Sequence, residues 1–449
     1  MKKNSYNRFW RLHFYAALFI TPLLITLTLS GIGYLFYTDV ENVLYDDLFF
    51  GDSDIEEAQS IDQAIEQANN TYDDFRVSRV IMLEDPYNTR LTLANGDGDQ
   101  RYVFLDENNQ VVGGQNANHT YSNVLRALHS SLFVGGTAVN YLVELAACWA
   151  IFLLVSGIYM TFKGKVLQNK KKTNKRQRTK KYHALLGLII TVPMVIIIFT
   201  GLPWSAVMGN VISTFSQENP SIGAPELKTT PPNSEVNEIP WATRNNETPN
   251  SESHSHHHGE HAGSDLHEES MISIQDLISQ IEDQNINKPY SIIYPSTKEG
   301  TFTVSKGSNS GVTGLDVSPD EEITNYFDQY SGTFVDSVSY EEYGVLQKWF
   351  SWGIPLHEGH LFGWPNKILN LLVCIGFLVV IFLGFKTWLS RKKKGSFSAP
   401  IKVSNKISAS FIVLMIALGI IMPLFGLSLI IIVIIELIIR LFAKYNQET

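Results

Sequence analysis

Cysteine is nearly absent from this chain of 449 residues, which contains only Cys148 and Cys374. Both lie inside apolar segments, where we interpret them as small buried side chains. The polar segments contain no cysteine, so no disulfide framework supports them. The chain also lacks a glycine-rich dinucleotide-binding motif, which excludes a built-in nucleotide-dependent reductase domain of that type.

Acidic residues are missing from three segments that are rich in lysine and arginine. Residues 1–11 contain four Lys or Arg, residues 163–181 contain ten and residues 386–406 contain seven. Such segments stay on the cytoplasmic side of a membrane. The net charge of −9 therefore reflects the acidic segments 38–140 and 209–366, which we expect on the outside. The basic inner face suits anionic membrane lipid, and nothing in the pattern requires nucleic acid.

Long apolar runs separate these polar segments. Stretches of about 20 apolar residues are typical of transmembrane helices. Because the runs contain few ionisable residues, they show no polar path for a transported substrate. The last two runs are short and could form either a hairpin or one kinked segment. The predicted spans are Trp10–Tyr37, Tyr141–Phe162, His183–Met208, Lys367–Leu389, Ile407–Met422 and Leu427–Phe442.

The predicted fold is mainly α, a multi-pass helical bundle with a four-helix core built from two repeats. A C-terminal hairpin and two extracytoplasmic α+β domains complete it. Both chain ends are expected in the cytoplasm. The predicted parts are a first span (1–37), an outer domain (38–140), two spans with their basic loop (141–208), a linker (209–270), a second outer domain (271–366), a span (367–389), and a basic loop with the hairpin (390–449).

Each outer domain is expected to begin with a helix and continue as antiparallel strands. Alternating apolar residues bounded by turn-forming residues indicate the strands. The predicted helices are Ser60–Asn70 and Ser273–Gln284. The predicted strands are Val77–Leu83, Arg90–Leu93, Arg101–Leu105, Gln110–Val112, Tyr290–Tyr294, Gly300–Lys306 and Glu322–Phe327.

Four histidines at predicted membrane edges recur in register between the two halves of the chain. Two begin spans and two precede spans, and each is followed by a glycine at nearly the same distance in both halves. His13 and His183 lie 18 residues before Gly31 and Gly201, and His129 and His357 lie 28 and 27 residues before Gly157 and Gly384. Two halves of the same orientation imply a pseudo-two-fold axis along the membrane normal.

This axis would bring His13 towards His183 and His129 towards His357. Neutral imidazole is a common haem ligand, and an ionisable group at membrane depth is a functional candidate by default. We therefore predict two b-type haems, an inner one on His13 and His183 and an outer one on His129 and His357. His360 is an alternative outer ligand. The competing interpretation is that each histidine is a polar anchor or a hydrogen-bonded structural group.

A second histidine cluster lies in the stretch 217–270, whose composition predicts disorder. The cluster consists of His254, His256, His257, His258, His261 and His267. Imidazole suits Zn and Cu ions, so this segment could bind either metal. It could equally be a flexible acidic linker with incidental metal binding.

Several short motifs, taken in order, resemble those of the PepSY-associated transmembrane proteins. They are Arg-Leu-His (11–13), Leu-His-Ser-Ser-Leu (128–132), Tyr-His-Ala-Leu-Leu-Gly (182–187), Thr-Gly-Leu-Pro-Trp-Ser (200–205), Asp-Gln-Tyr-Ser-Gly (328–332) and Pro-Leu-His-Glu-Gly-His-Leu-Phe-Gly (355–363). The resemblance implies a multi-pass protein of the bacterial cytoplasmic membrane whose two outer domains are PepSY-like. It also implies a haem-bearing reductase of the kind that reduces ferric siderophores.

The leading functional prediction is therefore electron transfer through haem to an external acceptor, with a ferric chelate as the expected acceptor, in iron acquisition. Because the chain lacks its own nucleotide-binding domain, the donor would be a cytoplasmic flavoprotein or a membrane quinol. The alternative is a non-enzymatic protein whose PepSY domains bind or restrain an extracellular partner such as a peptidase. A transporter is a third hypothesis.

Overall fold

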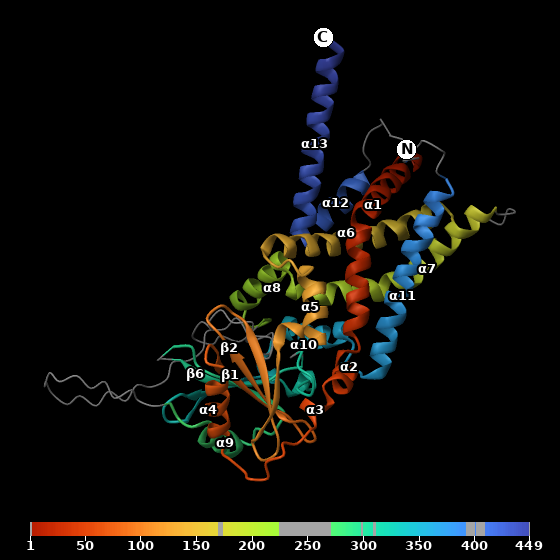
Figure 1. Ribbon diagram of the computed structural model, residues 1–449. Helices are drawn as coiled ribbons and strands as arrows, with labels where there is room; N and C mark the ends of the chain where they lie inside the picture. Colours follow the sequence, from red (N-terminus) through yellow and green to blue (C-terminus); the bar gives the residue numbers. More distant parts are fainter. Residues whose placement is uncertain are drawn as a thin grey trace, which may run out of the picture. The chain divides into compact units, whose positions relative to one another are not determined.

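The structure, a computed structural model, describes residues 2–168, 174–223, 271–297, 300–308, 311–391, 400 and 409–448 (Figure 1). The chain forms two compact units. The helical unit consists of Met1–Leu35, Leu125–Ile212 and Leu356–Thr449. The sheet unit consists of Phe36–Val124 and Ser213–Pro355.

Long apolar helices make up most of the helical unit. Within the described ranges, four are long and apolar enough to cross a membrane: α1 (Lys2–Tyr34), α6 (Thr137–Lys163), α7 (Lys175–Gly201) and α11 (Trp364–Leu389). Helix α1 packs against α6, α7 packs against α11, and α6 also contacts α7. The small residues Ala146 and Ala150 are completely buried in α6, which allows the neighbouring helices to approach closely. These four helices agree with the first four predicted spans.

The fifth and sixth predicted segments form two separate helices, α12 (Ala409–Ile421) and α13 (Pro423–Glu448). Their apolar parts are shorter than those of the four candidate spans. A Cβ atom added to Gly419 would lie 3.2 Å from the Cα atom of Gly426, so the backbones of the two helices nearly touch. Phe425, at the start of α13, is fully buried and packs 4.8 Å from the ring of Trp149 on α6. The chain therefore bends sharply between α12 and α13 and returns against α6.

Three shorter helices, α5 (Tyr121–Ser131), α8 (Ala206–Glu218) and α10 (Val345–Glu358), were not foreseen from the sequence. Helix α10 ends before Gly359, whose φ of +90° is a conformation that favours glycine. His129 and His357 lie in the last turns of α5 and α10. Each of these two histidines therefore lies on a separate short helix, and not in a loop that leads into the next candidate span.

The sheet unit contains one antiparallel sheet of eight strands in the order β4-β3-β2-β1-β5-β6-β7-β8. The strands are β1 (Arg76–Met82), β2 (Thr89–Ala94), β3 (Gln100–Leu105), β4 (Val111–Asn116), β5 (Tyr290–Ile293), β6 (Thr301–Lys306), β7 (Ile323–Asp328) and β8 (Phe334–Ser339). The pairing of β1 with β5, which places Val80 opposite Ile292, joins the two predicted α+β segments edge to edge. The two segments therefore share a single sheet, and β8 was not anticipated.

One face of this sheet is covered by α4 (Ile61–Thr71) and α9 (Ile274–Asp283), which Figure 1 shows close together below the strands. Ser60 caps α4 through a reciprocal bond with Gln63, and Ser273 caps α9. Asp62 of α4 accepts the backbone N–H of Ile274 at 2.8 Å, which ties the two helices together. Apolar residues of both helices and both groups of strands form one core.

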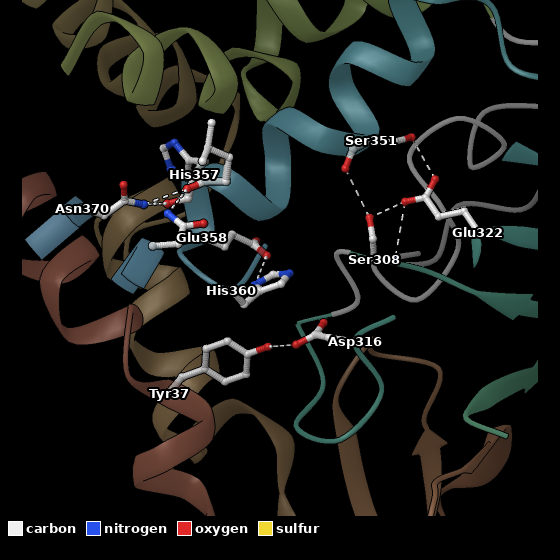
Figure 2. A network of polar contacts seen from close by, with 11 residues as sticks. Tyr37, Ser308, Asp316, Glu322, Ser351, His357, Glu358, His360 and Asn370 are labelled. Carbon is white, nitrogen blue, oxygen red and sulfur yellow. Dashed lines mark hydrogen bonds and ion pairs between the residues drawn. The ribbon is translucent and has the colours of Figure 1, made fainter. Parts of the chain in front are cut away.

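The opposite face of the sheet carries polar side chains that are also buried. Glu322, immediately before β7, accepts the hydroxyl of Ser351 at 2.9 Å and the backbone N–H of Ser308 at 3.3 Å (Figure 2). Burial next to Glu322 raises the pKa of Tyr343 well above its usual range. Within the sheet unit, this network joins α10 to the sheet.

The remaining short elements are α2 (Tyr37–Leu44), α3 (Asp46–Phe49) and 3-10 helices at Ala117–His119, Leu202–Trp204, Pro319–Glu321 and Tyr340–Glu342.

Candidate functional site

The imidazoles of His129 and His357 face each other inside the helical unit. Their ring centroids are 6.2 Å apart and their planes cross at 69°. His129 comes from the end of α5 and His357 from the end of α10, so each half of the chain contributes one ring. We call this arrangement the first histidine pair.

His13 on α1 and His183 on α7 form a second histidine pair. The two imidazoles are close enough to interact electrostatically. The structure therefore places the rings of one predicted couple, His129 and His357, close together, and it shows an electrostatic interaction between the members of the other. Their role as ligands stays a prediction.

In the second half of the chain, the histidines bond directly to backbone carbonyls. The Nδ1 atom of His357 lies 2.6 Å from the carbonyl oxygen of Ile197, and that of His183 lies 2.9 Å from the carbonyl oxygen of Val380. A carbonyl only accepts, so each Nδ1 carries the proton. In the neutral ring the lone pair is then on Nε2, the nitrogen that remains to bind a metal.

In the first half of the chain, the histidines bond to serine hydroxyls. The Nδ1 atom of His129 lies 3.0 Å from Oγ of Ser30, and that of His13 lies 2.8 Å from Oγ of Ser156. The hydroxyl of Ser30 donates towards the carbonyl of Leu27 at 3.0 Å. A hydroxyl has one proton, so when that proton points to the carbonyl the serine oxygen accepts from the imidazole. The hydroxyl of Ser156 likewise donates to the carbonyl of Leu153 at 3.2 Å.

Glycines lie against all four imidazoles, always on a neighbouring helix of the same half. Added Cβ atoms at Gly31, Gly157, Gly201 and Gly384 would lie 3.4, 3.8, 2.8 and 3.4 Å from the Cε1 atoms of His129, His13, His357 and His183. Each ring therefore rests against a helix backbone, and at Gly201 an added Cβ atom would crowd the ring. The glycines that the sequence singled out by spacing serve here as contact surfaces for the rings.

The protonation state of the first histidine pair follows from its environment. Burial, together with the smaller effect of the neighbouring His357, lowers the pKa of His129 to about 4. Burial also lowers the pKa of His357. Both rings are therefore neutral near pH 7, which is the form of imidazole that binds metals.

Asparagines of α11 support the end of α10 that carries His357. The side-chain amide of Asn370 donates to the carbonyl of Leu356 at 2.7 Å and to that of His357 at 3.2 Å (Figure 2). Asn366 donates to the same carbonyl of Leu356 at 3.2 Å. The last carbonyls of a helix have no partner within the helix, so these amides fix the turn that bears His357.

His360 is placed differently from the four paired histidines. Its Nδ1 atom lies 3.7 Å from a carboxylate oxygen of Glu358, on the segment that follows α10 (Figure 2). The six histidines from His254 to His267 lie outside the described residues, so a Zn or Cu site there stays a prediction. Among the residues that the structure describes, no three His, Cys, Asp or Glu side chains gather as ligands for a bare metal ion.

The fold and these sites define a membrane protein with four apolar helices in a histidine-containing helical unit and with a separate β-sheet unit. Residues 10–391 match the model of the PepSY-associated TM region. The chain therefore belongs to the PepSY-associated transmembrane family. No curated protein matches the chain.

Sequence reasoning missed the residues that orient the imidazoles. Ser30 and Ser156 directly precede Gly31 and Gly157, and the recurring Ser-Gly pair at two helix ends was the available signal. The carbonyl acceptors of the second half leave no trace in the sequence, because every residue has a carbonyl group. Asn370 was also missed, although a polar residue inside an apolar span was a visible hint.

Proposed function

We propose that the first histidine pair binds one b-type haem, that the second pair binds another, and that the protein transfers electrons across the membrane. The observation that carries this proposal is the 6.2 Å separation of the His129 and His357 rings. Two imidazoles that bind one metal from opposite sides, with bonds of about 2.0 Å, have ring centroids about 6 Å apart.

The residues present suit a haem with two imidazole ligands. A porphyrin supplies the other four nitrogens, so two histidines are sufficient. In all four histidines the Nδ1–H is already bound, which leaves Nε2 for iron. Haem iron with both axial positions filled by the protein transfers single electrons rather than binding small ligands.

Two sites fit the distance that an electron must cross. The hydrocarbon core of a bilayer is about 30 Å thick, so a single site cannot serve both faces. His13 lies near the basic N-terminal end of α1, and His129 contacts Gly31 near the other end of the same helix. We therefore propose one haem site near each membrane face, with the lysine-rich and arginine-rich segments in the cytoplasm.

The proposed direction is outward, from a cytoplasmic flavoprotein or a membrane quinol to an external acceptor. A ferric chelate is the proposed acceptor, because reduction to the softer and less charged Fe(II) weakens the hold of a hard oxygen-donor chelate. The protein's own contribution is to fix four neutral imidazoles through hydrogen bonds and glycine contacts. Fixed ligands require little reorganisation when the charge on iron changes.

The experiment that tests this function places the purified protein in liposomes with a reductant trapped inside and a ferric chelate outside. Formation of external Fe(II) should require the protein. The variants His13→Ala and His129→Ala should each abolish it, because each breaks one of two sites in series. His360→Ala is the matched control and should retain transfer if His357 is the ligand.

Loss of transfer in His360→Ala with retention in His357→Ala would assign the outer ligand to His360. A protein that contains haem but never reduces an external chelate would limit the proposal to another acceptor. A protein without haem would instead favour the alternative, in which the sheet unit binds an extracellular partner without redox chemistry.

A further inference from the structure

Ser30 and Ser156 occupy matching places beside the two histidine pairs. In each pair, one imidazole donates to a serine hydroxyl and the other donates to a backbone carbonyl. His129 and His13 use the serines, whereas His357 and His183 use the carbonyls of Ile197 and Val380. Both pairs are therefore chemically asymmetric, and the asymmetry has the same sense in each.

The serines are placed so that their hydroxyl oxygens can accept from the imidazoles. Ser30 is 2 % exposed and Ser156 is 0 % exposed, so water does not compete for their hydroxyls. The proton of Ser30 is directed towards the carbonyls of Thr26 and Leu27, at 2.9 and 3.0 Å. Ser30 thus lies beside both the carbonyl of Leu27 and the imidazole of His129, and the same carbonyl also interacts with that imidazole.

The second half of the chain shows how an imidazole is bound without a serine partner. Thr200 precedes Gly201 as Ser30 precedes Gly31, and its hydroxyl also donates to two helix carbonyls, those of Ile196 and Ile197. His357 nevertheless donates directly to the carbonyl of Ile197 at 2.6 Å. A hydroxyl at this position therefore does not by itself determine the partner of the imidazole.

We infer that Ser30 and Ser156 are positioning residues that set the reduction potentials of the two haem sites separately, Ser30 at the first histidine pair and Ser156 at the second. This inference rests on the proposed function. A hydrogen bond from Nδ1–H to an acceptor makes the imidazole a more basic ligand, which favours Fe(III). Removing the acceptor favours Fe(II) and raises the potential of the site concerned.

The test is a redox titration of the purified protein followed by its absorption spectrum. Ser30→Ala should raise the potential of one haem and leave the other in place, whereas Ser156→Ala should raise that of the other haem. The expected change is about tenfold in the equilibrium constant for reduction, or about 59 mV for one electron. Ser30→Thr restores a hydroxyl and should return the potential towards that of the natural protein.

Thr200→Ala is the matched control, because it removes a buried hydroxyl that donates only to backbone carbonyls. It should leave both potentials nearly unchanged. The inference is overturned if Ser30→Ala and Ser156→Ala move the same haem, if neither moves any haem, or if Thr200→Ala has an equal effect.

A natural protein without haem overturns the proposed function instead. The serine assignment is then tested on that haem-free protein by nitrogen-15 NMR of its histidines. Ser30→Ala should reduce the population of the Nδ1–H form of His129, and Thr200→Ala should not. An unchanged population in Ser30→Ala would reject the assignment.

Discussion

Replacing Gly201 with alanine should selectively disable the first histidine pair. The added Cβ atom would lie 2.8 Å from Cε1 of His357 and 3.3 Å from its Nδ1. Real Cβ atoms essentially never approach another atom as closely as 2.8 Å, so the ring or the helix must move. The ring cannot tilt away freely, because its Nδ1–H is bound to the carbonyl of Ile197 on the same helix as Gly201.

The size of the effect follows from this crowding. Inserting a methyl group into a well-packed interior typically costs about 1–3 kcal/mol. If the cost falls on the placement of His357, affinity for a ligand between His129 and His357 drops by roughly tenfold for each 1.4 kcal/mol. We therefore expect Gly201→Ala to lose most of the haem at this site and to keep the haem at the His13–His183 pair.

The assay is haem content per purified chain, measured together with the low-spin absorption spectrum. Gly157→Ala is the matched control, because its Cβ atom would lie 3.8 Å from Cε1 of His13, an ordinary contact. Gly157→Ala should retain nearly all haem, while Gly201→Ala should retain about half. Full haem content and an unchanged spectrum in Gly201→Ala would refute the reasoning.

Two further predictions concern stability. Glu144→Ala should destabilise the helical unit by about 2–3 kcal/mol, because the buried carboxylate accepts the backbone N–H groups of Val207 at 2.7 Å and Met208 at 3.2 Å. Thermal unfolding in detergent checks this, and a loss no larger than that of Glu144→Gln would contradict it. Phe302→Ala should destabilise the sheet unit by about 3–5 kcal/mol, because Phe302 is fully buried in the core under α4 and α9. Limited proteolysis at increasing temperature measures this loss of stability, and unchanged protection of the sheet from cleavage would count against a shared core.

The sequence was sufficient to locate the long helices and most strands. Apolar runs define α1, α6, α7 and α11 because a membrane span needs about 20 such residues. Alternation of apolar residues located β1, β2 and β3 to within about a residue or two. Alternation does not identify a strand's neighbour, however, so the pairing of Val80 with Ile292 was unpredictable.

The site was only partly predictable for a similar reason. The equal spacings of His13 to Gly31 and His183 to Gly201 indicated the histidines, but these spacings run along single helices. In the structure His13 contacts Gly157, which lies on another helix. Sequence spacing records which positions recur, whereas packing decides which residues meet. The helical placement of His129 was also missed, because α5 is a short helix without a long apolar run.

The most direct measurement of the central claim is the haem content of the purified natural protein, with a reduced-minus-oxidised spectrum of the same sample. Two low-spin haems per chain are predicted, falling to one in His129→Ala. A haem-free protein from cells supplied with haem, or a haem content that His129→Ala and His13→Ala leave unchanged, would contradict the claim that the histidine pairs bind iron.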